Sequence, residues 1–308
     1  MGTLDRKTTL DSKTRVWKKV GCFYALTLIF SFTFGGFILR AGKLEAGNLL
    51  FVTGAMWSPA LATFATKKIF RERIRDLPWQ WAEGRYIALA YFLPVGYSLP
   101  IYLFVWFTGL GPFNSSTLPK ILADFGWQNL PTGFGVSLFV LFTATLGMVA
   151  KLSRAIGEEI GWRGFLVPEL TKVVGFRGVG AISGLMWAAF HYPVLLFADY
   201  NSGAPAWYSI VCFTLWVVIA SYIMAWLTLR ARSLWPAAIL HASHNLFIQS
   251  ILTPLTKDAG PTKYIIDEFG IGLVVTITIV AVLVWIMLGR ESPSRLASSG
   301  LKRSEART

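Results

Sequence analysis

The sequence predicts an all-α polytopic membrane protein, a bundle of about eight transmembrane helices. Of its 308 residues, 54% are hydrophobic and only 15% are charged, and the mean hydropathy is +0.54. A soluble domain carries about 25% charged residues. Several uninterrupted apolar runs reach the roughly 18 residues that cross a bilayer as a helix. A soluble cytoplasmic enzyme and a disordered protein are therefore excluded, and so is a disulfide-rich secreted fold, because Cys22 and Cys212 are the only cysteines.

The apolar runs define the expected helices. In chain order they lie at about 20–39, 47–66, 86–108, 133–153, 179–198, 207–229, 234–254 and 271–289. The first run is not a cleaved signal peptide, since no small-residue cleavage site follows it. The loops 109–132 and 254–270 are long enough for short surface helices, which the sequence does not decide.

The distribution of basic residues predicts the orientation. With the N-terminus in the cytoplasm, the cytoplasmic segments hold 24 Lys and Arg residues and the opposite side holds 5, which together account for all 29. This is the positive-inside pattern. We therefore expect a multi-pass protein of the cell membrane with both termini cytoplasmic. The net charge of +13 then has its explanation in the loops, and no nucleic-acid partner is expected.

Ionisable side chains inside the predicted membrane region are few, and they belong to three helices. All three histidines, His191, His241 and His244, lie within predicted spans, and Glu158 and Glu159 follow directly after the fourth span. Buried ionisable groups in membrane proteins usually face a cavity or a partner. Their concentration here indicates a functional site.

The adjacent glutamates have different neighbours. On a helix, Glu159 and Arg163 are i and i+4 with the acid first, the better orientation for an ion pair. Glu158 points about 100° away and has no basic residue one turn later. We expect Arg163 to hold Glu159 ionised, while Glu158 faces a drier cavity and can serve as general base for water. The alternative is a solvated cytoplasmic helix with one surface salt bridge.

Two further motifs carry the histidines. His241 and Asn245 share one helix face at i and i+4, where they could donate to an oxyanion or, for His241, bind a metal ion. Interhelical hydrogen bonding is the alternative. His244 either lines the same cavity or packs. His191 follows Trp187 by four residues, and a structural role is nearly as plausible for it as a functional one.

Together these motifs resemble those of the CPBP family, the CAAX-processing prenyl endopeptidases and their bacterial relatives, also called the ABI family. The resemblance covers about residues 130–250 and rests on E-E-x-x-x-R, aromatic-x-x-x-His and His-x-x-x-Asn in that order. The residues that carry it are Glu158, Glu159, Arg163, Trp187, His191, His241 and Asn245.

The resemblance implies an intramembrane endopeptidase of eight helices with an intramembrane catalytic cavity. Glu158 would activate the hydrolytic water with help from His191. His241 and Asn245 would stabilise the oxyanion, while Glu159 and Arg163 would hold the site together. The substrate would be a membrane-bound peptide or lipidated protein, such as a prenylated CAAX-type chain, reached from the bilayer. The oligomeric state is not readable from the sequence.

The sequence departs from the family pattern at two positions. The second motif's usual Phe is Trp187, and His244 is an additional imidazole beside the third motif. The family was long regarded as one of metalloproteases, and its prenyl-processing members look better described as glutamate-dependent. A divalent metal such as zinc therefore stays open, with His191, His241 and Glu158 as candidate ligands and His244 as an extra one.

The chain is expected to divide into five regions. These are a basic cytoplasmic N-terminus (1–19), N-terminal transmembrane helices (20–129), a catalytic core (130–254), a loop with the last helix (255–289) and a basic flexible tail (290–308). The site should open toward the cytoplasm, because Glu158 follows the inner end of the fourth span. The position of His191 conflicts with an opening toward the cytoplasm, because His191 lies about 18 Å from the expected inner face.

Other functions are less well supported. The H-E-x-x-H zinc motif is absent and no Asp lies in a predicted span, which excludes two protease classes. A rhomboid-like serine site would need a Gly where Ala181 stands. A proton-coupled transporter would predict inverted repeats, and none is found. A non-catalytic family member acting as a scaffold or immunity protein stays open.

Overall fold

The chain folds as a helical bundle. The computed structural model describes residues 2–41, 49–114 and 118–288. Within these ranges the regular structure is helical, apart from one isolated β-bridge between Phe113 and Thr256. The predicted all-α membrane fold is confirmed. The basic tail at 290–308 lies outside the described residues.

The α-helices are α1 (Gly2–Ala41), α2 (Leu49–Ile69), α3 (Gly84–Thr108), α4 (Leu118–Asp124), α5 (Thr132–Phe142), α6 (Met148–Gly161), α7 (Val167–Leu170), α8 (Phe176–Phe197), α9 (Ala206–Ala231), α10 (Trp235–His244) and α11 (Ile271–Leu288). Three π-helical segments, Thr143–Gly147, Trp162–Leu166 and Asn245–Leu252, continue α5, α6 and α10. Short 3-10 helices occupy Ile74–Asp76 and Thr262–Tyr264. The loop 109–132 therefore does contain a short helix, α4, and the loop 254–270 contains a 3-10 turn.

All eight predicted runs are helical, but the expected number of spans needs correction. Within the described chain, six helices are long and apolar enough to cross a membrane, and the apolar stretch of α11, Ile271–Ile286, is shorter. The predicted span 234–254 is α10 followed by a π-helical segment, and it is not among the six. The physical reason is burial. Pro236 to His244 are all buried by other helices, so α10 need not present apolar side chains to lipid.

The fourth span also differs from the prediction. Helical structure runs without a break from Thr132 to Leu170, so both glutamates of the first motif lie inside it rather than beyond its end. Three of the basic residues counted as cytoplasmic, Lys151, Arg154 and Arg163, are consequently in a helix and not in a loop.

Glycines bring α6 close to α2. A Cβ atom on Gly157 would lie 2.7 Å from the Trp57 ring, and one on Gly161 would lie 2.4 Å from Pro59 Cβ. Only glycine permits this approach. The two glycines flank the glutamate pair in the sequence, and the close packing fixes this turn of α6 within the bundle.

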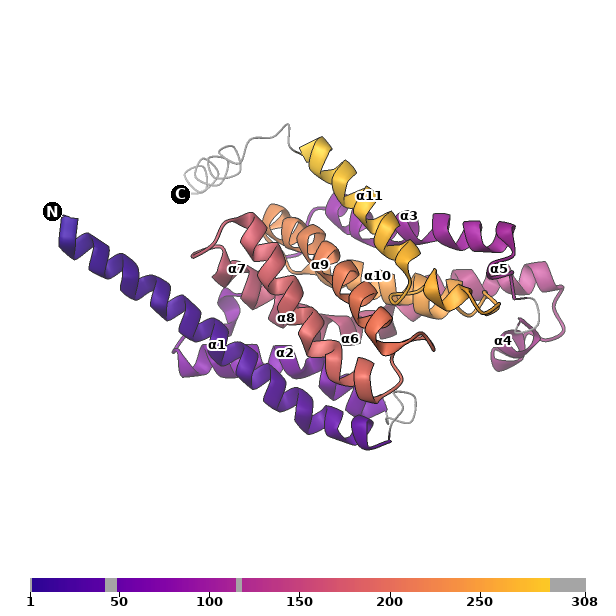
Figure 1. Ribbon diagram of the computed structural model, residues 1–308, viewed down its shortest axis with the longest axis horizontal. Coiled ribbons are helices and arrows are strands. Elements are labelled where there is room, and N and C mark those ends of the chain that lie inside the picture. Colours follow the sequence, from indigo (N-terminus) through magenta and orange to yellow (C-terminus); the bar gives the residue numbers. More distant parts are fainter. Residues whose placement is uncertain (1, 42–48, 115–117, 289–308) are drawn as a thin grey trace.

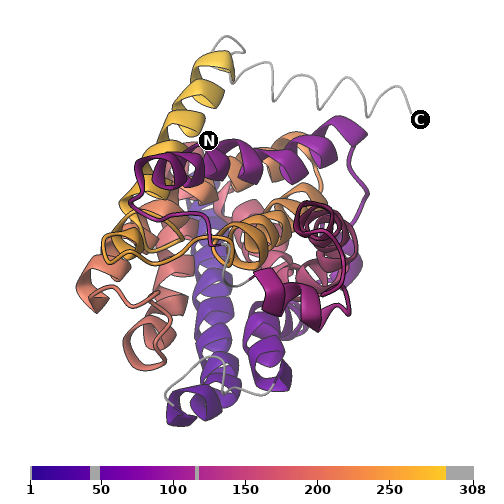
Figure 2. The ribbon, with the colours of Figure 1, turned by 90° about the vertical axis from the view of Figure 1, so that its right-hand side faces the viewer.

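The helices are arranged in three groups (Figures 1 and 2). One side of the bundle is the α1–α2 pair, and the opposite side is formed by α3 and α11. Between them lie α6, α8, α9 and α10, and the motif residues lie on α6, α8, α10 and the π-helical segments that continue α6 and α10. The motif residues are therefore shielded on both sides.

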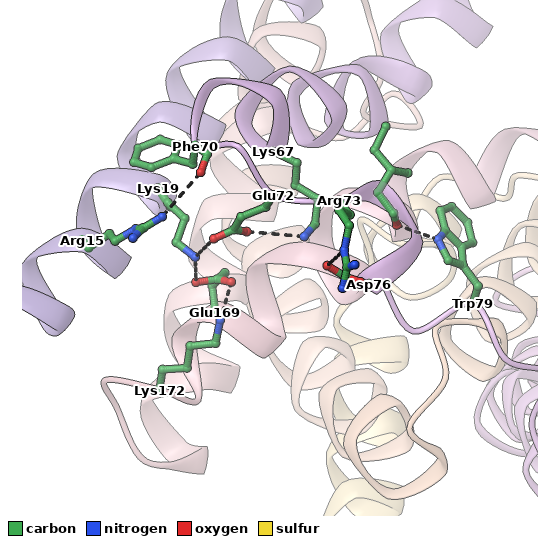
Figure 3. A network of polar contacts seen from close by, with 11 residues as sticks. Arg15, Lys19, Lys67, Phe70, Glu72, Arg73, Asp76, Trp79, Glu169 and Lys172 are labelled. Atoms are coloured by element: carbon green, nitrogen blue, oxygen red, sulfur yellow. Dashed lines mark hydrogen bonds and ion pairs between the residues drawn. The ribbon is translucent and has the colours of Figure 1, made fainter.

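Ion pairs fasten α1 to the rest of the bundle (Figure 3). The buried Lys19 Nζ lies 2.7 Å from Glu72 Oε1 and 2.7 Å from Glu169 Oε2, joining α1 to the connection after α2 and to α7. Lys67 and Lys172 add further contacts to these acids. Burial alone would raise the pKa of Glu72, but the hydrogen bond and charge of Lys19, with help from Lys67, outweigh it, so the pKa lies below its ordinary value.

Candidate active site

A cavity of about 210 Å³ lies inside the bundle between α1, α2, α6, α8 and α10. We call the side formed by α1 and α2 the apolar wall; its lining residues are Leu28, Ser31, Phe32, Gly35, Ile38, Leu39, Val52, Ala55 and Met56. We call the opposite side the polar wall; its chemically active lining residues are Lys151, Arg154, Glu158, His191, His241, His244 and Asn245. The predicted site residues Glu158, His191, His241, His244 and Asn245 thus share one cavity.

Glu158 presents one carboxylate oxygen to the cavity. Its side chain is 1% exposed, and Oε2 accepts hydrogen bonds from Trp187 Nε1 at 2.7 Å and Trp162 Nε1 at 3.3 Å. These two indoles fix the orientation of the carboxylate and leave Oε1 to face the cavity, which Glu158 lines. A carboxylate held in this way can position a water molecule.

Glu159 binds both Arg163 and His241. Both of its oxygens lie 2.9 Å from Arg163 Nη1, so the predicted i, i+4 ion pair is present. Its Oε1 also accepts from His241 Nδ1 at 2.9 Å. Glu159 and Arg163 are both 0% exposed, which means that this is a buried network and not the solvated surface pair that the sequence left open.

Trp187 connects the glutamates and the histidines. Besides donating to Glu158, its ring lies 4.1 Å below the Arg163 guanidinium carbon and 5.4 Å from the His241 ring. Phe at this position could stack in the same way but could not donate a hydrogen bond. The departure from the usual Phe therefore adds a donor to Glu158.

The tautomer of His191 is set by its own helix. Nδ1 lies 3.0 Å from the carbonyl oxygen of Trp187, and a carbonyl accepts only, so Nδ1 carries the proton. This leaves Nε2 of the neutral ring as an acceptor in a cavity that His191 lines. The ring packs against Phe190 and Phe213, which hold its position.

His244 belongs to a separate network. Its Nδ1 lies 2.7 Å from the Tyr97 hydroxyl, its Nε2 lies 3.0 Å from Glu268 Oε1, and the ring stacks 4.1 Å from Trp216. Glu268 also accepts from the Tyr200 hydroxyl and from Gln249 Nε2. Both nitrogens of His244 are therefore engaged, and the imidazole fixes the loop before α11.

The pKa values of Asp267 and Glu268, the two adjacent acids in that loop, are shifted from their ordinary values. Burial raises the pKa of Asp267, and the adjacent charge of Glu268 raises it further. Burial alone would also raise the pKa of Glu268, but the hydrogen bond and charge of His244, followed by hydrogen bonds from Tyr200 and Gln249, lower it below its ordinary value. Glu268 is the ionised member of this pair, and Asp267 is the member more ready to hold a proton.

A metal ion at this site would need donor atoms that are not already engaged by protein groups. Within the described residues, no three His, Cys, Asp or Glu side chains converge as metal ligands. His241 directs Nδ1 to Glu159, and His244 directs both nitrogens to protein groups. His244 is therefore not available as the extra ligand, and a zinc ion held by His191, His241 and Glu158 stays a prediction.

The sequence placed His191 deeper in the membrane than Glu158, but in the structure the two residues lie at similar depth. Glu158 is 12 residues, or about 18 Å, from the end of the helix at Leu170, and His191 is 15 residues, or about 22 Å, from the start of α8 at Phe176. Because these two helix ends adjoin, Glu158 and His191 lie at similar depth.

The lining residues give the direction in which the cavity extends. Its lining residues come from the second half of α1, the first half of α2 and the second half of α8. The cavity thus extends from Glu158 away from the end of the bundle at which Lys19 pairs with Glu72 and Glu169. The expectation that the site opens toward the cytoplasm stays a prediction, because it depends on the orientation of the chain in the membrane.

The sequence analysis did not identify three residues that contact the site, namely Trp162, Gln249 and Glu268. Trp162 stands at i+4 from Glu158, and its indole donor was the available signal. Glu268 and Gln249 gave no such signal, because they meet His244 and Lys151 only through tertiary packing.

A known protein family matches the part of the chain that holds the motif residues. Residues 125–247 match the family model described as Type II CAAX prenyl endopeptidase Rce1-like. The match covers 123 of the 308 residues and supports the resemblance to the CAAX-processing endopeptidases. The Rce1-like match contains every motif residue from Glu158 to Asn245, whereas the apolar wall, Gln249 and Glu268 lie outside it. No curated protein matches the chain.

Proposed function

We propose that this Rce1-like protein is an intramembrane endopeptidase that hydrolyses a peptide bond with a water molecule activated by Glu158. The observation that carries the proposal is the state of Glu158: a buried carboxylate with one oxygen fixed by two indoles and the other facing the cavity. The family is one of endopeptidases, which agrees with this chemistry.

The reaction assigns a role to each group. Glu158 Oε1 accepts a proton from water as the water oxygen attacks the peptide carbonyl, with His191 Nε2 as a second acceptor that orients the water. The negative charge that develops on the carbonyl oxygen is stabilised by the Asn245 amide and by His241 Nε2–H, which requires the imidazolium form because Nδ1 donates its proton to Glu159. Protonated Glu158 then gives its proton to the leaving amine as the C–N bond breaks. The products are the shortened peptide with a new C-terminal carboxylate and the released C-terminal fragment with a new amino terminus.

The walls of the cavity support a lipidated substrate. On the apolar wall, Ser31 is the one polar side chain among the nine lining residues of α1 and α2. Such a surface suits an isoprenoid or acyl chain, because burying apolar area is favourable by about 25 cal/mol per Å². We infer that the substrate is a membrane-associated peptide of the prenylated CAAX type, with the lipid against α1 and α2 and the scissile bond against α6. We also propose that the protein lies in the cell membrane with both termini in the cytoplasm.

The test is a cleavage assay in lipid nanodiscs, which leave both faces accessible. A fluorogenic farnesylated CAAX peptide would be incubated with wild type, Glu158→Gln and the matched control Glu83→Gln, whose side chain is exposed on a loop. The glutamine amide retains an oxygen that accepts from the indoles, so folding should be preserved. We expect turnover to fall by about 10²–10⁴ in Glu158→Gln and to be unchanged in the control.

A chelator arm completes the assay. Wild-type turnover that survives chelation supports the glutamate mechanism, whereas turnover abolished by chelation would contradict it in favour of a metal. Full activity of Glu158→Gln would also contradict it. No turnover by wild type would favour a non-catalytic binding protein of the same family.

A further inference from the structure

Two basic residues line the cavity on the same face of α6 as Glu158. Lys151, Arg154 and Glu158 are spaced i, i+3 and i+7, which places them in one stripe along the helix. The two cations lie beyond Glu158 in the direction in which the cavity extends. None of the catalytic steps above uses them.

Neither charge is neutralised within the described part of the chain. Among the residues that the structure describes, no carboxylate lies within ion-pair distance of Lys151 or Arg154. Lys151 Nζ donates to Gln249 Oε1 at 3.4 Å, and Arg154 Nε donates to the carbonyl of Ala150 in its own helix, also at 3.4 Å. Cations in a membrane interior are costly and normally have a partner. A bound anion would supply it.

The nearby acids are already engaged. Glu268 accepts from Tyr200, His244 and Gln249, and Gln249 is thereby turned so that its oxygen faces Lys151. Glu158 directs one oxygen to the two indoles, and the proposed reaction uses the other to accept the proton from water. The Arg154 guanidinium can form a two-pronged contact with a carboxylate, with Lys151 as a second, point-like cation beside it.

The distances from Glu158 to the two cations along α6 correspond to a defined length of extended peptide. Along the helix axis, Arg154 lies about 6 Å and Lys151 about 10 Å from Glu158. An extended peptide advances about 3.3 Å per residue, so this distance corresponds to about two to three residues. We propose that Lys151 and Arg154 bind the C-terminal carboxylate of the substrate and so select chains that end about two to three residues after the scissile bond. This inference rests on the proposed function.

Binding can be tested without turnover. The Glu158→Gln protein in phosphatidylcholine nanodiscs would be titrated with a fluorescent farnesylated CAAX peptide, either with its free C-terminal carboxylate or as the C-terminal amide. We expect the amide to bind roughly 10-fold more weakly. Adding Arg154→Gln or Lys151→Gln should weaken the carboxylate peptide by a similar factor and leave the amide unchanged. Arg75→Gln, at an exposed residue of the connection between α2 and α3, is the matched control.

Three results would overturn the inference. These are equal affinity for the two peptides, equal weakening of both by Arg154→Gln, or a peptide preference that survives both substitutions. A lipid phosphate in place of the peptide carboxylate would show as equal peptide affinities together with thermal stabilisation by phosphatidylglycerol that Arg154→Gln abolishes. Cleavage without a carboxylate preference would remove this inference and keep the proposed function. A carboxylate preference without cleavage would do the reverse.

Discussion

The two walls of the cavity differ in chemistry and in their relation to the family. The polar wall holds the motif residues Glu158, His191, His241 and Asn245, and it lies within the stretch that matches the Rce1-like family model. The apolar wall comes from α1 and α2, which lie outside that stretch and contribute one hydroxyl and no charge. Under the proposed function, the reaction and the recognition of the lipid belong to different parts of the chain, and we expect that each can be changed without the other.

The polar wall depends on its internal ion pair, and breaking that pair should have the largest effect. Arg163→Met leaves Glu159 buried without its main counter-charge, and removing one partner of such a pair costs about 3–5 kcal/mol. We expect a large fall in thermal stability in detergent. The double variant Glu159→Gln, Arg163→Met should recover most of it, because no unpaired charge is left. If the single variant were as stable as wild type, the polar wall would not depend on this pair.

The apolar wall can be filled at one residue. A Cβ atom on Gly35 would meet no atom within 4 Å, and Gly35 lines the cavity. Leu at this position should occupy the space for the lipid and raise KM for a farnesylated peptide about 10-fold, which corresponds to about 1.4 kcal/mol of lost apolar contact. The KM of the same peptide without its lipid should not change.

Gly36 provides the matched control for this substitution. It is also open to a Cβ atom, but it is exposed on the outer face of α1 and does not line the cavity. Gly36→Leu should therefore behave as wild type in steady-state kinetics. Equal effects of the two substitutions would show that α1 does not contact the lipid.

The smallest effect is expected away from both walls, at Glu72. Because the folded pKa of this group lies below its ordinary value of 4.5, its ion pairs stabilise the protein above that pH and the contribution is lost as the pH falls through the folded pKa. Glu72→Gln should lower stability by about 1 kcal/mol at pH 7 and make no difference in strong acid. Thermal unfolding across this pH range measures it. Turnover should be unchanged, since the Lys19 network does not line the cavity.

Much of this arrangement was readable from local sequence. Eight apolar runs predicted the helices, and the i, i+4 spacing predicted the Glu159–Arg163 pair, because both depend on residues close in the chain. The end of the fourth span was misplaced, since Lys151 and Arg154 read as the start of a loop although they line a cavity inside a continuous helix. The anchoring of His241 by Glu159 and the pairing of His244 with Glu268 were not readable, because they join segments that meet only in the folded bundle.

The most direct test of the division between the two walls is the affinity for a farnesylated peptide, measured by fluorescence titration in nanodiscs. Wild type, at a temperature where turnover is slow, would be compared with Glu158→Gln and Gly35→Leu. The account predicts an unchanged Kd for Glu158→Gln and a Kd raised about 10-fold for Gly35→Leu. A Kd raised by Glu158→Gln and unaffected by Gly35→Leu would contradict it, because the lipid would then bind to the polar wall.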